Sequence, residues 1–168
     1  MKELDKIIES KVKIRFPDCD PFNHLNNSKY IDYIINARED QLLNFYDFDV
    51  HKLVKEQGIG WVVSQNQIAY LYPATLMETV VIQSQLLSFT DKSLVVEAIM
   101  LDENKTNLKA VLWTKLVHYD LKINRSTLHS EELIEFFKQV ENPLPKAFSF
   151  EERLENLKLS LRTTPSKN

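Results

Sequence analysis

Consecutive strand-like segments with short turns between them constrain the fold of this chain more than any other feature. These segments are rich in valine, isoleucine, leucine, threonine and aromatic residues, the composition of β-strands. They cover residues 61–72, 78–89, 93–102 and 108–121. TDKS (90–93) and DENKTN (102–107) separate the last three and have turn composition. Strands joined by tight turns run antiparallel, because parallel neighbours need a long crossover, so this part of the chain predicts an antiparallel sheet.

One more strand and a long helix are predicted before this sheet. Val12, Ile14 and Phe16 alternate with basic residues, which is typical of a half-buried strand, and Pro17 ends it. Helical spacing then predicts one buried stripe, whose members are Ile31, Ile34, Ile35, Arg38, Leu42 and Phe45. The predicted layout is α+β, with a long central helix wrapped by a curved antiparallel sheet of about five strands. This arrangement is called a hotdog fold.

We expect a single domain over all 168 residues, because this length is enough to bury one hydrophobic core. The strands and the long helix place that core at about residues 8–121, which leaves 122–168 as a C-terminal extension. Within the extension, 131–139 has the pattern of a helix with Ser130 as its N-cap. The charged tail that follows has a helical pattern until Pro165.

The composition excludes several classes of function. The net charge is −3 and no basic block is present, so binding to nucleic acid has little electrostatic support. Only two glycines occur, Gly58 and Gly60, which excludes the glycine-rich phosphate loops of nucleotide-binding folds. No apolar run approaches the ~20 residues of a membrane helix, and the charged N-terminal residues contain no signal-peptide core. We therefore expect a cytoplasmic protein that binds neither nucleic acid nor membrane.

The loop before the long helix, DCDPFNHLNN (18–27), gathers the most reactive side chains. Cys19 is a poor nucleophile, since carboxylates on both sides disfavour its thiolate, and we expect it to be a small buried side chain. Asp18, Asp20 and His24 suggest a metal site, but the other histidines are scattered without ligand spacing, so we expect no metal and no other cofactor. The plainest alternative is a loop in which aspartates form turns and asparagines cap the helix.

A further interpretation gives this loop a chemical role. The N-terminus of a helix presents unpaired N–H groups and a partial positive charge, which can polarise a carbonyl and hold a developing oxyanion. A carboxylate a few residues earlier can act as a general base for water or attack the carbonyl directly. One short segment would then supply both parts of a hydrolytic site.

The same loop carries a family resemblance. RFPDCDPFNHLNNSKYIDY (15–33) resembles the signature of the 4-hydroxybenzoyl-CoA thioesterase family of hotdog proteins, Asp-x-Asp-x-x-(Gly)-His-x-Asn-Asn-x-x-Tyr. VVSQNQIAYLYPA (62–74) is similar to the next strand of that family. Asn23 stands where many members have glycine, and asparagine tolerates the left-handed backbone that glycine allows. In this position the chain resembles the long-chain acyl-CoA thioesterase branch of the family, which also lacks this glycine.

The resemblance implies an acyl-CoA thioesterase that releases free acid and CoA without a metal. It makes Asp20 the catalytic base or nucleophile, and the backbone N–H at about Asn27 the donor that polarises the thioester carbonyl. The supporting residues that it implies are Asp18, His24 and Asn26. It also implies a homodimer or homotetramer, because relatives pair their sheets edge to edge. Asn66 and Tyr70 of a second copy would then bind substrate opposite Asp20.

Two alternatives stay open at this point. An acyl carrier protein can replace CoA as the thioester donor, or the chain can be a hotdog protein that binds acyl groups without catalysis. The sequence does not specify the length of the acyl chain.

Overall fold

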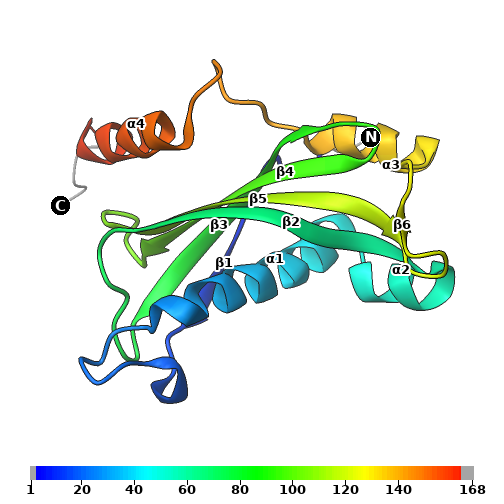
Figure 1. Cartoon of the computed structure of the whole chain (residues 1–168). Helices are drawn as coiled ribbons and strands as arrows, with labels where there is room; N and C mark the ends of the chain where they lie inside the picture. Colours follow the sequence, from blue (N-terminus) through cyan, green and yellow to red (C-terminus); the bar gives the residue numbers. More distant parts are fainter. Residues whose placement is uncertain (1–2, 164–168) are drawn as a thin grey trace.

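The structure, a computed structural model, describes residues 3–163 and has the α+β layout that the sequence predicts (Figure 1). Its strands are β1 (Ile7–Lys13), β2 (Ile59–Tyr70), β3 (Thr79–Phe89), β4 (Ser93–Asp102), β5 (Leu108–Asp120) and the short β6 (Arg125–Ser126). Its helices are α1 (Tyr30–Tyr46), α2 (Val50–Gln57), α3 (Glu131–Val140) and α4 (Phe150–Thr163). Two 3-10 turns, η1 (Phe16–Asp18) and η2 (Asn27–Lys29), lie between β1 and α1.

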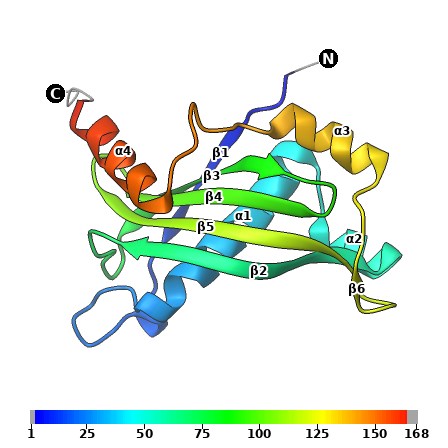
Figure 2. The same ribbon diagram turned by 45° about the horizontal axis from the view of Figure 1, so that its top comes forward.

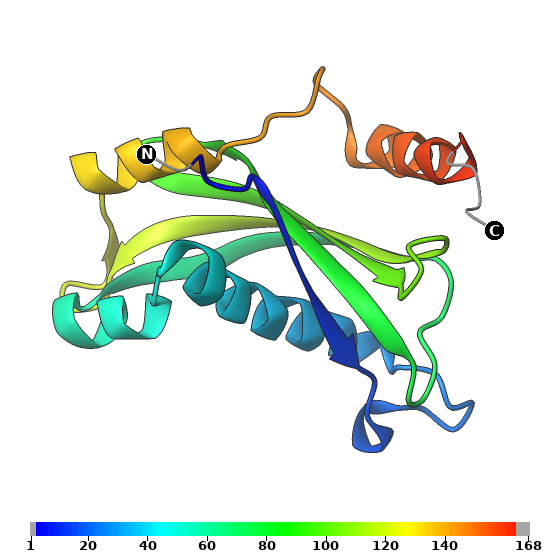
Figure 3. The ribbon, with the colours of Figure 1, turned by 180° about the vertical axis from the view of Figure 1, so that it is seen from behind.

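The sheet has the strand order β1-β3-β4-β5-β2, and all neighbours are antiparallel. It curls over α1, while α4 lies against the opposite face (Figures 1 and 2). Seen from behind, α3 packs at the end of the sheet near the C-terminus of α1 (Figure 3). The rings of Tyr46 on α1 and Phe136 on α3 are 5.5 Å apart, centroid to centroid. The predicted hotdog layout, a long helix wrapped by an antiparallel sheet, is confirmed.

Both faces of the central strands are covered. On β5, Leu112 belongs to the core between the sheet and α1, whereas the adjacent Val111 belongs to a second cluster on the outer face. Phe150 and Leu154 of α4 pack on that second cluster. The prediction that residues 108–121 form a strand covered on both faces is confirmed, and helix α4 provides the outer cover.

The first strand lies earlier than predicted. β1 ends at Lys13, and pairing continues only to Ile14, whose N–H donates to the carbonyl of Glu78 (2.9 Å). Phe16 and Pro17 instead enter η1, because the fixed φ of proline suits the start of a helical turn. Phe16 is 74% exposed, so its prediction as part of a half-buried strand is wrong.

The buried stripe of α1 also differs from the predicted one. Its buried residues are Tyr30, Ile34, Ala37 and Gln41. Gln41 can be buried because its Nε2 donates to Ser10 Oγ (2.8 Å) and to the carbonyl of Ile82 (2.9 Å). Its Oε1 accepts a hydrogen bond from Ser84 Oγ (2.6 Å). The prediction is wrong at Phe45, which is 43% exposed.

Candidate active site

Asp20 organises the loop that precedes α1. Its Oδ1 accepts hydrogen bonds from the backbone N–H groups of Phe22 (2.9 Å) and His24 (3.1 Å). The N–H of Asp20 donates to the carbonyl of His24 (2.8 Å), which closes the loop from the other side. Asn23 takes the left-handed conformation, with φ 60°, that its side chain tolerates. The loop therefore holds the Asp20 carboxylate in a fixed place through bonds to Oδ1.

Asp18 supports the same loop but faces α1. Its Oδ2 accepts a hydrogen bond from the hydroxyl of Tyr33 (2.7 Å), and its carbonyl accepts one from the N–H of Asn26 (2.9 Å). The Tyr33 oxygen also accepts the N–H of Arg15 (3.1 Å). Burial, and then the bond to Asp18, raises the pKa of Tyr33, so its hydroxyl keeps the proton that it donates. Asp18 thus anchors the chain on both sides of the loop.

The start of the helix lies directly after this loop. Asn26 is the cap, since its Oδ1 accepts the N–H of Ser28 (3.0 Å), and η2 then leads from Asn27 into α1. An asparagine therefore caps the 3-10 turn that leads into α1, whereas Lys29, the residue before α1 itself, makes no capping bond with its side chain. The first N–H groups of a helix lack partners within the helix. Asn27, whose N–H the resemblance assigns to the thioester carbonyl, is the first residue of η2, three residues before α1 begins.

A second segment fixes the loop from outside. The backbone of His24 pairs with that of Thr75, and the N–H of Leu25 donates to the carbonyl of Ala74 (2.8 Å). The N–H of Leu76 donates to the carbonyl of Asn23 (2.9 Å). The β2–β3 connection therefore holds His24 and its neighbours, which places His24 next to Asp20.

Tyr70 and Asn66 lie on β2, an edge strand, and only Tyr70 contacts the helix start. The Tyr70 hydroxyl donates to the carbonyl of Asn27 (3.1 Å), and its ring packs edge-on against Tyr30, 5.1 Å between centroids. Asn66 instead accepts a hydrogen bond from Thr114 on β5. Within one chain, Tyr70 thus joins the predicted site, whereas Asn66 is held at the sheet.

Cys19 lies between the two aspartates. The sequence predicted a buried side chain, but in the structure Cys19 is only partly buried. Its Sγ donates to the carbonyl of Arg15 (3.4 Å). Burial, and then the charges of Asp18 and Asp20, raises the pKa of the thiol, so a reactive thiolate is disfavoured. Across residues 3–163, no group of three histidine, cysteine, aspartate or glutamate side chains is arranged to hold a metal ion.

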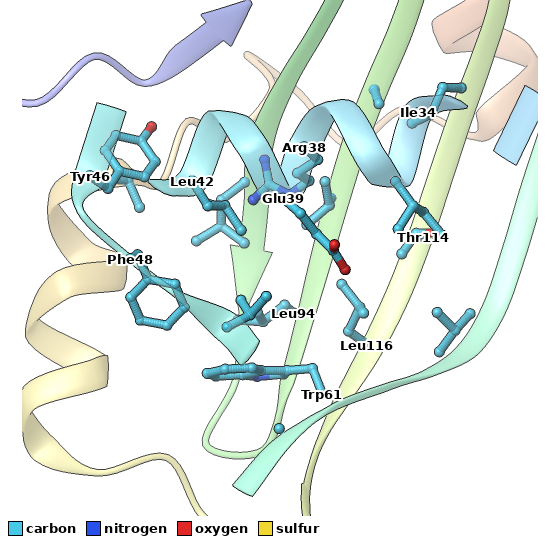
Figure 4. A pocket seen from close by; sticks show the side chains of 18 of the residues that line it. Ile34, Arg38, Glu39, Leu42, Tyr46, Phe48, Trp61, Leu94, Thr114 and Leu116 are labelled. Carbon is cyan, nitrogen blue, oxygen red and sulfur yellow. The ribbon is translucent and has the colours of Figure 1, made fainter. Parts of the chain in front are cut away.

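An apolar cavity of about 360 Å³ runs along α1 beyond this loop. It extends from Ile34, one turn into the helix, to Tyr46 at its end, and Trp61, Leu94 and Leu116 from the sheet line it (Figure 4). The helix rises ~1.5 Å per residue, so these lining residues span roughly 18 Å. The cavity is long enough for an extended aliphatic chain.

Sequence reasoning missed this cavity. Its lining residues include Trp61, Phe136 and Phe137, which the sequence places in ordinary apolar segments. Core and cavity side chains share the same composition, so no local pattern separates them. The sequence contained one indication of a cavity, which is that Arg38 stands in an otherwise apolar stripe of the long helix.

Two histidines that are far from the loop come together behind the cavity wall. The rings of His118 and His129 are 4.7 Å apart, and the indole Nε1 of Trp61 donates to His129 Nε2 (3.1 Å). Burial lowers the pKa of both imidazoles, which keeps them neutral at pH 7. These two histidines are 11 residues apart in the sequence, and in the fold they contact Trp61 and orient it.

Comparisons with known proteins identify the family of this chain. Residues 14–141 match the thioesterase-like superfamily. The long-chain acyl-CoA thioesterase FadM of Escherichia coli (strain K12) is 28% identical over 133 residues, which cover 79% of this chain and 98% of that protein. Within residues 3–163, none of the helices is long and apolar enough to cross a membrane.

Solved structures share the fold. YbaW, a probable thioesterase from Escherichia coli, has a TM-score of 0.68 and 27% identity, and the match covers 80% of this chain and 99% of that one. SAV2348 from Staphylococcus aureus, solved in complex with CoA, has a TM-score of 0.75 and covers 90% of this chain and 94% of its own. Its identity is 10%, so this second likeness concerns the fold alone.

Proposed function

The chain belongs to the thioesterase-like superfamily and is a thioester hydrolase, as its loop sequence implies, and we propose that its substrate is a long-chain acyl-CoA. The observation that carries this proposal is the apolar cavity along α1, which begins at Ile34, seven residues after Asn27. An aliphatic chain in that cavity would leave its thioester near the start of the helix. The FadM relative, named for long-chain acyl-CoA, supports this chain length.

In the proposed reaction, Asp20 acts on the thioester carbonyl or on water. The loop N–H groups bond to Oδ1, so Oδ2 is the oxygen that we assign to the chemistry. As a general base, Oδ2 takes a proton from water while the water oxygen bonds to the carbonyl carbon. The C–S bond then breaks, and the CoA thiolate leaves with that proton. As a nucleophile, Oδ2 bonds to the carbonyl carbon and the C–S bond breaks, which releases the CoA thiolate and leaves an anhydride between Asp20 and the acyl group. Water then cleaves the anhydride to free acid and the regenerated carboxylate, and the proton set free goes to the thiolate.

The start of α1 supplies the second half of this mechanism. The carbonyl oxygen gains negative charge as the tetrahedral intermediate forms. The backbone N–H at Asn27 and the positive end of the helix dipole stabilise that charge more than they stabilise the neutral carbonyl. Asp18, His24 and Asn26 keep the loop and the helix start in register, which is the supporting role assigned to them.

The test is release of free thiol from acyl-CoA esters of increasing length by the purified chain. Each buried methylene contributes about 0.8 kcal/mol, so kcat/KM for palmitoyl-CoA is expected to exceed that for acetyl-CoA by far more than tenfold. Equal rates with all lengths would contradict the role of the cavity. Release from acyl-carrier-protein thioesters in preference to CoA thioesters would favour the carrier-protein alternative, and binding without hydrolysis would identify a non-catalytic protein.

We also expect the active form to be at least a homodimer. β2 is an edge strand whose central residues are exposed, including Val62 (40%) and Val63 (46%), and an uncovered apolar edge favours pairing with another copy. Residues 66–70 of the second copy would then face Asp20. Light scattering at micromolar concentration should give at least twice the mass of the 19.7 kDa chain. A fully active monomer would contradict this prediction.

A further inference from the structure

Arg38 places a cation in the wall of the apolar cavity. Its side chain is partly buried among the lining residues, and its Nη1 donates to Ser84 Oγ on β3 (2.9 Å) (Figure 4). The Ser84 hydroxyl in turn donates to Gln41 Oε1 (2.6 Å). The groups that contact the guanidinium in this network are therefore neutral.

No carboxylate balances this charge within the part of the chain that the structure describes. The ion pairs found there within 4.0 Å do not include Arg38. Glu39, its neighbour on the helix, also lines the cavity, and its carboxylate makes a hydrogen bond with His51 Nε2 (2.9 Å) rather than with Arg38 (Figure 4). Burial lowers the pKa of Arg38 to about 10, so the guanidinium stays protonated at neutral pH.

Neutral hydrogen bonds also hold α1 on the sheet beside Arg38. Gln41 already braces the helix with neutral hydrogen bonds to Ser10 Oγ (2.8 Å) and to the carbonyl of Ile82 (2.9 Å). A guanidinium carries five N–H donors, and the bond to Ser84 uses one of them. A cation in apolar surroundings is costly unless an anion pairs with it. The remaining donors of Arg38 therefore point to an anionic ligand.

We propose that Arg38 is a subsite for a carboxylate carried on an aliphatic chain that lies in the cavity. The planar guanidinium matches a carboxylate with two parallel hydrogen bonds. Leu42, Trp61 and Leu116 supply the apolar lining for the chain. The cavity volume of about 360 Å³ lies in the range of small-molecule sites.

Two kinds of molecule carry this group. One is a free fatty acid, with its carboxylate at Arg38 and its tail along the apolar lining. The other is an acyl thioester whose far end carries a carboxylate, and this second source rests on the proposed function. From Asn27 to Arg38 the backbone advances by roughly 16 Å at helical rise, a distance that a medium-length aliphatic chain spans.

The first test measures binding without any reaction, by calorimetry of the full chain with decanoate and with decan-1-ol. Decanoate is expected to bind roughly ten- to a hundredfold more tightly, because hydrogen bonds to charged groups are among the strongest in proteins. Arg38→Gln keeps a donor for Ser84 but removes the charge, and should abolish this preference, whereas Arg38→Lys should retain part of it. Arg125→Met, at an exposed arginine on β6, is the matched control and should bind like the parent chain.

The second test separates the two sources. It compares hydrolysis of decanoyl-CoA with that of the CoA thioester of decanedioic acid, which has a carboxylate at its far end. A preference for the diacid ester that Arg38→Gln removes assigns the subsite to substrate, and decanoate binding without that preference assigns it to free fatty acid. Binding without any hydrolysis would leave the subsite standing while overturning the proposed function. Equal affinity of the parent chain for decanoate and decan-1-ol would overturn the subsite.

Discussion

Asp20→Asn is expected to lower turnover of acyl-CoA at least about a hundredfold, because an amide can act neither as a general base nor as an effective nucleophile near neutral pH. The fold should survive, since the amide oxygen of asparagine can still accept the N–H groups of Phe22 and His24 that now bond to Oδ1. The measurement is thiol release at saturating substrate, with circular dichroism as the folding control. A folded variant that keeps more than about a tenth of the rate would show that Asp20 is not the catalytic group.

Asp18→Asn is the matched control for this experiment. The Oδ2 atom of Asp18 is occupied by the hydroxyl of Tyr33 (2.7 Å), and asparagine retains an oxygen that can accept this bond. Its loss of activity should be much smaller than that of Asp20→Asn. If Asp18→Asn is the inactive variant, the catalytic role belongs to the first aspartate of the motif.

Arg153→Met is expected to lower the free energy of unfolding by about 3–5 kcal/mol, because it leaves a buried carboxylate without its counter-ion. Glu97 on β4 has 2% of its side chain exposed. Arg153 on α4 donates from Nη2 to its Oε1 (2.7 Å) and from Nε to its Oε2 (2.8 Å). Burial alone would raise the pKa of the Glu97 carboxyl, but the bonds from Arg153, Trp113 and Gln85 lower it overall.

Urea unfolding at neutral pH, followed by circular dichroism, measures this loss. The thermal midpoint should fall by about 6–20 °C, at about 2–4 °C per kcal/mol for a chain of this size. Lys158→Met, which breaks an exposed ion pair with Glu155 on the same helix, should leave the urea midpoint and the thermal midpoint unchanged. If the unfolding midpoints of Arg153→Met change as little as those of Lys158→Met, the prediction is wrong. A single transition would also support our proposal that the extension and the core form one domain.

The pH dependence of the same pair has a definite sign. A carboxyl whose pKa is lowered by folding stabilises the protein above its ordinary pKa, and this contribution disappears as the pH falls through the lowered value. In Arg153→Met, the bonds from Trp113 and Gln85 remain but the charge and the bonds of Arg153 no longer offset burial, so the pKa of Glu97 should rise. The deficit of the variant should therefore be largest at neutral pH and shrink in acid, where Glu97 is protonated and uncharged.

Local patterns in the sequence determined most of the fold. The predicted strand 93–102 coincides with β4, and Ser130 caps α3 by accepting the N–H of Leu133 (3.2 Å). Both follow from interactions between residues that are close in the chain, such as side-chain periodicity, turns and caps. The loop 18–27 was likewise identifiable, because its polar residues and the helix after it are contiguous. Two errors, at Phe16 and Phe45, lie near the ends of elements, where tertiary contacts decide how far a pattern extends. A third, the burial of Gln41, lies inside α1 and depends on partners from β1 and β3.

The tertiary structure alone decided which groups from distant segments meet. Glu97 and Arg153 are 56 residues apart, and their pairing depends on where α4 lies on the sheet. Gln41 and Arg38 depend on a distant residue in the same way, because both form hydrogen bonds with Ser84 on β3. Ser84 lies 43 residues after Gln41 and 46 residues after Arg38. The sequence by itself thus determined the elements, their order and the loop that starts the helix. The cavity and the position of Arg38 in its wall arise only when the sheet curls over α1. A cavity is bounded by side chains from both the helix and the sheet, so neither segment alone specifies it.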